Sequence, residues 1–312
     1  MPTEQGKLRS FGDSYIGSRR NNEDALGKRE PQDSVLREER GCLYVVSDGM
    51  GGHAAGEVAS HMAVKVVLEE YYADRRGVEI SMESAIRVAS QRIYEAAGDS
   101  IETEGMGCTV AVCAVFPERV CIAWVGDSRV YLRHKGQVQL QTTDHTIVED
   151  RHHLSRAVGV QPDVEVPEPL RCQWEPGDRL LLCTDGLSNT LSEAEIAACL
   201  AEPTPRAAVV ELLRLAAEHK ANDNCTAVIV DYPLVAAPED HDSQSDGNPT
   251  LSEPCAEKPG DVAIPETVSP ESATNERPSS ESLASGRSDS SRGSGVLRRL
   301  MGWRSNPPRT RG

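Results

Sequence analysis

The sequence predicts an α+β fold, in which strands that are neighbours along the chain pair in antiparallel sheets and helices cover those sheets. Two observations support this prediction. Strand-like runs rich in Val, Ile, Leu, Cys and Tyr follow one another with short turns between several of them. Helix-like segments gather in a pair rather than alternating one by one with strands. A strict strand–helix alternation would instead have predicted a parallel sheet.

Apolar residues at helical spacing predict two successive helices. The residues at this spacing are Ala59, Met62, Ala63, Val66 and Val67 in the first helix, and Met82, Ala85, Ile86, Ala89 and Ile93 in the second. A third helix is predicted from Thr204 to about His219, because Pro205 suits the first turn of a helix.

Six runs predict strands. They span residues 42–47, 108–116, 120–125, 129–133, 179–184 and 225–231. Gly126-Asp127-Ser128 lies between two of these runs, and this turn-forming sequence predicts a hairpin.

The composition changes at Pro233 and predicts two regions. Residues 234–312 are rich in Pro, Ser, Glu and Asp and have almost no aromatic residues, so they cannot bury enough apolar surface to offset the entropy of ordering. We therefore expect a folded domain over 1–233 and a disordered tail over 234–312. Within the tail, 292–312 holds six Arg and no acid. Its segment 295–304 could contact an acidic membrane or an acidic partner.

The overall charge is −16, which argues against a nucleic-acid partner and favours divalent cations. Nine Cys stand at irregular spacings with no C-x-x-C pair, and the chain opens with no charged-then-apolar leader. These features predict a reduced, cytoplasmic protein rather than a disulfide scaffold. No apolar run approaches the length of a membrane span.

Carboxylates recur beside the predicted strands. Asp48 and Asp185 each follow a strand in a hydroxyl-Asp-Gly sequence, S-D-G at 47–49 and T-D-G at 184–186. The other acids near strand ends or the N-terminus are Glu23, Asp24, Asp127 and Asp223. Because a rigid sheet can direct side chains at its strand ends towards one point, we expect these acids to converge.

Clustered carboxylates repel one another, and a hard divalent cation removes that cost. Oxygen ligands without Cys or clustered His favour Mg²⁺ or Mn²⁺ over zinc. Gly49 lets the backbone approach closely, and its carbonyl offers a further ligand. Two ions that share a carboxylate would lower the pKa of a bridging water and hold a phosphoryl oxygen. The alternative is that each Asp-Gly is simply a turn.

A dinucleotide site is a second alternative. The stretch 49–54 fits G-x-G-x-x-G/A after a strand and before a helix, with Glu69 about twenty residues on. However, Asp48 would place a negative charge beside a pyrophosphate. Glu69 also falls within a predicted helix, whereas the pattern requires it at the end of the next strand.

Eight motifs occur in an order that resembles the metal-dependent Ser/Thr protein phosphatase family, the PPM or PP2C type, and its bacterial branch. They are GSRRNNEDA, VVSDGMGGHAAGEVAS, GCTVAV, VGDSRVYL, TTDHT, LSRAVG, LLLCTDGL and NDNCTAVIV, which lie between about residues 8 and 232. The resemblance implies an α-β-β-α four-layer sandwich, with two antiparallel sheets flanked by helices.

The same resemblance implies a set of metal ligands. Asp48 would bridge two ions of Mg²⁺ or Mn²⁺, with the Gly49 carbonyl on one of them. Asp185 and Asp223 would complete the coordination of the other ion. Asp127 would belong to a weaker third site that it shares with Asp185.

It also implies roles for residues around the metals. Glu23 and Asp24 would bind or orient metal-bound waters, and Arg19 would hold the substrate phosphate in bidentate fashion. Many eukaryotic members have a His directly after the Asp-Gly as a candidate general acid. Met50 takes that position here and His53 lies three residues further on, so the resemblance assigns no general acid.

The expected function is hydrolysis of phosphoserine and phosphothreonine in protein substrates of Ser/Thr kinases. A metal-bridged hydroxide would attack phosphorus in line, and a Cys nucleophile is not expected because no C-x₅-R loop is expected. The alternative is a pseudophosphatase that binds metal or phosphopeptide without turnover; the complete acid set favours the enzyme. Between His145 and Leu154 only eight residues remain, too few for the helical flap of relatives, so the site should be open there.

Overall fold

The computed structural model describes residues 8–51, 54–98, 103–147 and 150–233. The predicted disordered tail, its segment 295–304, and His53 lie outside the described residues. The domain boundary at Pro233 therefore stays a prediction.

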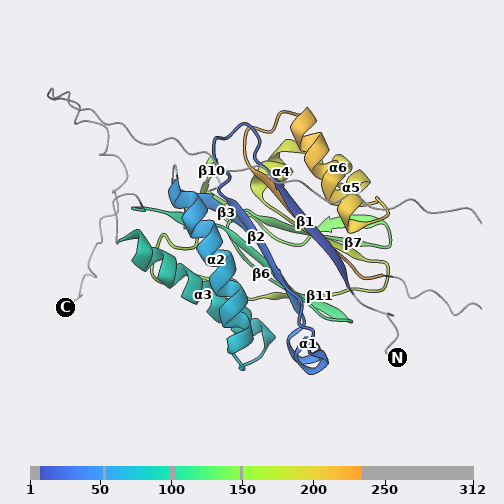
Figure 1. The fold of residues 1–312 in the computed structure, drawn as a ribbon, viewed down its shortest axis with the longest axis horizontal. Coiled ribbons are helices and arrows are strands. Elements are labelled where there is room, and N and C mark those ends of the chain that lie inside the picture. Colours follow the sequence, from blue (N-terminus) through green and yellow to red (C-terminus); the bar gives the residue numbers. More distant parts are fainter. Residues whose placement is uncertain (1–7, 52–53, 99–102, 148–149, 234–312) are drawn as a thin grey trace, which may run out of the picture. The chain divides into compact units, whose positions relative to one another are not determined.

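Two antiparallel sheets face each other (Figure 1). One has the order β1 (Arg9–Tyr15), β13 (Cys225–Asp231), β12 (Arg179–Cys183), β7 (Arg129–His134) and β8 (Gln137–Leu140). The other has the order β11 (Leu170–Gln173), β6 (Arg119–Val125), β5 (Val110–Val115), β3 (Cys42–Met50) and β2 (Asp24–Arg29), with β4 (Gly107–Cys108) paired to β3.

Helices cover the outer face of each sheet. α2 (Ala54–Ala73) and α3 (Val78–Ala97) pack against the sheet that contains β3. α4 (Asp185–Thr190), α5 (Glu193–Cys199) and α6 (Pro205–Glu218) cover the sheet that contains β13. The short α1 (Ser34–Arg40) connects β2 to β3.

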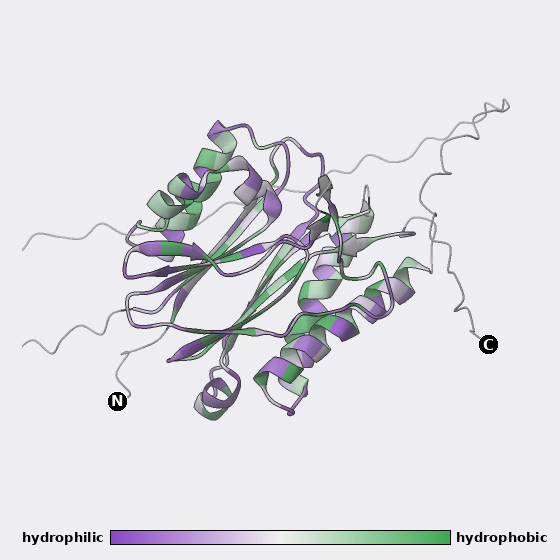
Figure 2. Cartoon of the chain, turned by 180° about the vertical axis from the view of Figure 1, so that it is seen from behind, coloured by the Kyte–Doolittle hydropathy of each residue, from purple (hydrophilic) through white to green (hydrophobic). Residues whose placement is uncertain are grey.

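Three apolar layers hold these elements together. Successive residues of β3 face opposite sides: Leu43 and Val45 pack against α2 and α3, whereas Tyr44 and Val46 pack between the sheets. A third layer lies under α4, α5 and α6. Figure 2 shows the apolar residues gathered along both sheets and on the helices that cover them. The expected α-β-β-α four-layer sandwich is confirmed.

The predicted helices are confirmed, because every predicted apolar residue of α3 is buried, and α2 buries Ala59, Ala63, Val66 and Val67. α6 begins as the sequence indicated: the Thr204 hydroxyl accepts a hydrogen bond from the Ala207 amide at 3.1 Å, and Pro205 occupies the first turn.

The predicted hairpin at Gly126-Asp127-Ser128 is wrong. β6 and β7 belong to different sheets, so this turn carries the chain from one sheet to the other. Gly126 has φ 106° and packs on Thr109, where an added Cβ would lie 2.6 Å from a side-chain carbon. The predicted strand 108–116 is likewise two strands, broken at Thr109. Both corrections concern the point where the two sheets meet.

The segment after His145 forms a small antiparallel pair, β9 (Thr146–Ile147) and β10 (Asp150–Leu154). Its described residues contain no helix, as expected from the short connection.

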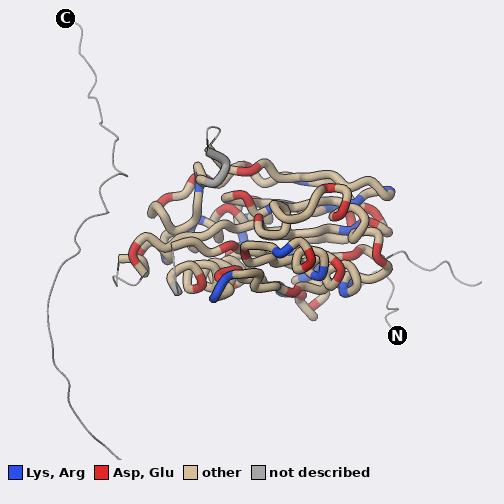
Figure 3. Tube along the Cα trace, turned by 90° about the horizontal axis from the view of Figure 1, so that it is seen from above, with Lys and Arg blue, Asp and Glu red and all other residues tan. Residues whose placement is uncertain are grey.

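Acidic and basic residues are interspersed over the described part of the chain (Figure 3). Within the same residues, no helix combines the length and apolar character needed to cross a bilayer.

Residues 1–233 alone should fold as stably as the full chain, because every helix and strand described ends at or before Asp231. Thermal unfolding of the two forms, followed by circular dichroism, checks this. A midpoint for 1–233 more than about 4 °C lower would mean that the tail contributes on the order of 1 kcal/mol or more, and that 234–312 belongs to the domain.

Candidate functional site

The site is built where β2 pairs with β3. Asp24 and Asp48 are directly opposite in the antiparallel register. The Gly49 amide donates to the Glu23 carbonyl at 3.1 Å. On the other side of β3, the Asp48 amide donates to the Thr109 hydroxyl at 2.9 Å. Hydrogen bonds from both sides therefore fix the backbone that carries Asp48.

Glycine is required here because three backbone segments approach closely. A Cβ on Gly49 would lie 2.1 Å from the Gly56 carbonyl oxygen in α2. A Cβ on Gly56 would lie 2.7 Å from a carboxylate oxygen of Glu23. The glycines after Asp48 therefore let α2 and the Glu23 carboxylate approach the strand end, which a side chain would prevent.

The second sheet supplies Asp185 and Asp223. Asp185 is the first residue of α4, directly after β12, and Asp223 precedes β13. Gly186 packs on this strand end, since a Cβ there would lie 2.0 Å from the Asn224 carbonyl oxygen. The side-chain amide of Asn189 donates to Asp185 at 3.0 Å.

Asp24 links the two sheets. One of its oxygens, Oδ2, accepts hydrogen bonds from the Thr184 hydroxyl at 2.8 Å and the Thr226 hydroxyl at 2.7 Å. The other, Oδ1, is buried and has no hydrogen-bond partner among the described residues. The side chain is 5% exposed. A buried oxygen left without a partner is costly unless a cation or water meets it.

The carboxylates raise one another's pKa values. Burial, opposed by the two threonine hydrogen bonds and assisted by the charges of Asp185 and Asp223, raises the pKa of Asp24 to about 7. Burial and the charges of Asp24 and Asp185 raise the pKa of Asp48 well above its usual range. Burial also raises the pKa of Asp185. The charges of Asp24, Asp48, Asp185 and Asp223 therefore act on one another. That the whole predicted set of acids forms one metal site stays a prediction.

Asp127 lies at the edge of this cluster. Burial and the charge of Asp185 raise its pKa to about 7. Asp127 and Asp185 both line a cavity of about 520 Å³. Arg129 forms two hydrogen bonds with Asp144, at 2.7 and 3.0 Å, along the same wall. The remaining lining residues are Leu140, Thr142, Thr143, Thr146, Ser188 and Asn189.

Arg19 is beside the acids but already has a partner. Its Nη2 donates to Asp223 Oδ2 at 2.6 Å and its Nε to the Asn222 carbonyl at 3.3 Å. Partial burial opposes the charged form, but the hydrogen bond and charge of Asp223 outweigh it and raise the pKa of Arg19. The side chain is 53% exposed, so the guanidinium can reach a ligand from solvent.

These residues fit Mg²⁺ or Mn²⁺. The donors are carboxylates and backbone carbonyls, the mutual repulsion is strong, and Asp24 Oδ1 has no hydrogen-bond partner in the part of the chain that the structure describes. Among the described residues, however, no group of three or more His, Cys, Asp or Glu side chains is arranged so that it could by itself hold a metal ion. Mg²⁺ usually takes one or two carboxylates and fills its other positions with water and phosphate, so a partial cage suits it.

Sequence reasoning missed the polar residues that support the acids. Asn224 accepts a hydrogen bond from the Glu23 amide at 2.8 Å and donates to the Ile16 carbonyl at 2.8 Å. His145 stacks on Trp124 and its Nδ1 accepts from the Gly126 amide at 3.1 Å, which fixes the turn before Asp127. The TDH and NDN motifs contained His145 and Asn224, but only the tertiary structure reveals what they contact.

The expected absence of a C-x₅-R pattern is wrong, although the conclusion drawn from it holds. Cys113 and Arg119 fit the C-x₅-R spacing of phosphatases with a Cys nucleophile. Cys113 lies fully buried within β5, and burial raises its pKa well above the usual range. Arg119 instead lies over the Phe116 ring. A thiol that is buried and protonated cannot attack a phosphate, so this match carries no activity.

The family profile and the similar sequences all belong to one kind of protein phosphatase. The family profile described as Protein phosphatase 2C matches residues 11–222. The serine/threonine phosphatase stp of Listeria innocua is 30% identical over 240 residues, which cover 70% of this chain and 92% of that protein. The serine/threonine protein phosphatase PstP of Mycobacterium tuberculosis is 32% identical over 224 residues, covering 66% of this chain and 43% of that protein.

Solved structures agree with these sequence matches. The crystal structure of Mycobacterium tuberculosis PstP superposes with a TM-score of 0.64 at 30% identity, over 73% of this chain and 99% of that chain. The catalytic domain of PstP in complex with two manganese ions gives a TM-score of 0.61 at 30% identity, over 72% of this chain and 97% of that chain.

Stability should depend on pH and metal together. Because the pKa values of Asp24 and Asp127 are raised to about 7, the folded chain binds more protons than the unfolded chain above about pH 4. In chelator, the melting temperature should therefore fall as the pH rises towards about 8. Added Mn²⁺ should raise it more at about pH 8 than at about pH 5, because protons compete for the same oxygens. Scanning fluorimetry measures this, and an equal metal effect at both pH values would contradict it.

Proposed function

The chain belongs to the protein phosphatase 2C family and is a protein serine/threonine phosphatase, and we propose that it hydrolyses phosphoserine and phosphothreonine in proteins with a water activated by Mg²⁺ or Mn²⁺. The observation that carries the metal requirement is that Asp24, Asp48 and Asp185 come from separate segments and influence one another. Beyond the effect of burial, the charges of Asp24 and Asp185 raise the pKa of Asp48, and the charge of Asp185 raises the pKa of Asp24.

Two ions would be held by residues from both sheets. Asp48 would contribute to both ions, the Gly49 carbonyl to one, and Asp185 and Asp223 to the other. When bound, the ions would lower the pKa of a coordinated water and offset the negative charge of the phosphoryl group. Asp127, beside Asp185, would contribute to a third and weaker site.

The residues around the ions would orient water. Glu23 is held by Asn224 through its amide, and Asp24 by two threonine hydroxyls. Asp24 Oδ1, which has no partner among the described residues, would be free to accept a hydrogen bond from a water in the cluster. Rigid acceptors of this kind position the water before the reaction begins.

Arg19 would bind the substrate phosphate. Its present partner is Asp223, one of the proposed metal ligands. Engagement of Asp223 by a cation would weaken this ion pair and leave the planar guanidinium for two phosphate oxygens. Binding of metal and binding of phosphate would thus support each other at Asp223.

The substrates would be phosphoproteins, reached through the open side of the site. The cavity beside Asp127 is bordered by Asp144 and Thr146, where the short β9–β10 segment begins. An open site fixes the substrate less firmly, so we infer broad peptide selectivity. The eight free thiols of the described part fit a reducing compartment such as the cytoplasm.

Replacing Asp48→Asn should reduce kcat on a phosphopeptide by at least about a hundredfold, because it removes a charge shared by two cations. Wild-type activity should vanish in chelator and return with Mn²⁺. The matched control is Asp163→Asn, which removes an exposed carboxylate whose partner is Arg87. Metal-independent turnover, or an Asp48→Asn variant as fast as the control, would contradict the two-metal proposal. A folded wild-type protein with no turnover would instead favour a pseudophosphatase.

Replacing Arg19→Lys should raise KM for a phosphopeptide by about tenfold, because Lys keeps the positive charge but cannot form the bidentate hydrogen bonds of a guanidinium. Steady-state kinetics at saturating Mn²⁺ provides the measurement. Arg20→Lys, one residue along the chain, is the control. Equal KM values for the two variants would remove Arg19 from phosphate binding.

A further inference from the structure

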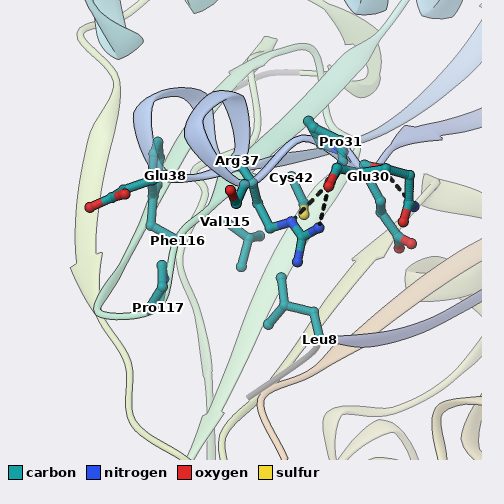
Figure 4. A pocket seen from close by; sticks show the side chains of 11 residues that line it. Leu8, Glu30, Pro31, Arg37, Glu38, Cys42, Val115, Phe116 and Pro117 are labelled. Carbon is teal, nitrogen blue, oxygen red and sulfur yellow. Dashed lines mark hydrogen bonds between the residues drawn. The ribbon is translucent and has the colours of Figure 1, made fainter. Parts of the chain in front are cut away.

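A second cavity lies at the other end of β3 from Asp48. It has a volume of about 320 Å³ and lies between α1, the start of β3 and the turn from β5 to β6 (Figure 4). Cys42 in its wall and Asp48 are six residues apart on one strand, or about 20 Å at the usual rise. A ligand here would not touch the phosphatase site.

The floor of this cavity is apolar. Its lining includes Leu8, Pro31, Cys42, Val115 and Phe116. Burial raises the pKa of the Cys42 thiol to about 11, so this side chain stays neutral. A volume of this size is at the lower end of the range for small-molecule sites and suits one ring or one branched alkyl group.

Arg37 supplies a cation within this apolar wall. Its Nε donates to the Pro31 carbonyl at 2.9 Å and its Nη2 to the Gln32 carbonyl at 3.3 Å. Within the described residues, its Nη1 makes no hydrogen bond and no carboxylate forms an ion pair with it. Figure 4 shows the guanidinium pointing into the cavity, towards Leu8. Two carbonyls therefore hold the group in place and leave one edge free.

The nearby acids do not compensate this charge. Glu30 accepts hydrogen bonds from Ser10 at 2.6 Å, Tyr44 at 2.9 Å and Lys28 at 3.2 Å. These contacts outweigh its partial burial and lower its pKa, so Glu30 is ionised and paired with Lys28. Glu38 is exposed, and in Figure 4 its carboxylate points away from the cavity.

We propose that this cavity binds a small apolar carboxylate, with the apolar group on Phe116 and Val115 and the carboxylate on the free edge of Arg37. A single guanidinium matches a single carboxylate in charge and geometry, whereas a phosphate dianion would call for more than one cation. The apolar lining removes water from around this ion pair and strengthens it.

The first test uses the full-length protein and three ligands of one shape: phenylpropionate, phenylpropanol and phenylpropylamine. Titration calorimetry in chelator keeps metals at the phosphatase site from binding the carboxylate. The carboxylate should bind about tenfold more tightly than the alcohol, because its hydrogen bond is charge-assisted, and the amine should bind least. No carboxylate binding, or equal affinity for all three, overturns the proposal without bearing on the phosphatase activity.

Variants then locate the site. Arg37→Met should abolish the preference for carboxylate over alcohol, whereas Arg133→Met, the same charge change at a distant strand, should keep it. Leu8→Trp should lower the affinity for both ligands by filling the cavity. If Arg133→Met lowers the carboxylate preference as much as Arg37→Met does, the effect is one of overall charge and the proposal fails. It also fails if only a chain without residues 1–7 binds, since that segment would then be the occupant.

Discussion

The antiparallel pairing of β2 with β3 places two carboxylates, Asp24 and Asp48, directly opposite each other. Like charges in this position destabilise a sheet, and burial makes the cost larger. The neighbouring features reduce or exploit this repulsion. Hydroxyls donate to Asp24, the backbone of Asp48 is fixed on both sides, and Gly49 and Gly56 let the helix approach the strand end. The arrangement favours the folded state most when a cation shares the carboxylates.

This repulsion also explains how the two sheets are tied together at the site. Asp24 belongs to one sheet, while Thr184 and Thr226, which donate to it, follow or lie within strands of the other. The chain crosses between the same sheets at Gly126, just before Asp127. A cation between Asp48 and Asp185 would join the sheets at one more point. Metal binding and docking of the sheets are therefore expected to be coupled, as the metal dependence of melting should reveal.

The sequence predicted helices and strands well where apolar residues recur at one regular spacing. Both helices of the α2–α3 pair and the first part of β3 follow directly from apolar spacing, and the repeated hydroxyl-Asp-Gly sequences indicated that acids would converge. The strand predicted over 42–47 continues to Met50, so Asp48 lies within β3 rather than after it. The turn at Gly126 was mistaken for a hairpin because three turn-forming residues look alike whether the next strand pairs locally or joins another sheet. The supports of the acids, such as Asn224 and His145, were missed because their partners are distant in the sequence.

The two ends of β3 differ in the charge of the ligand that each would favour. At the Asp48 end, several carboxylates meet and the backbone is crowded, so the region favours cations. At the Cys42 end, the strand is apolar, and the guanidinium of Arg37 forms no ion pair with a described residue, so the region favours an anion with an apolar body. β3 pairs with β2 from Leu43 to Asp48 and with β5 from Cys42 to Val46, and it is buried on both faces from Cys42 to Ser47. A ligand at the Arg37 end that shifted the strand would therefore move the Asp48 backbone, because a packed strand between two paired neighbours transmits displacement rather than absorbing it.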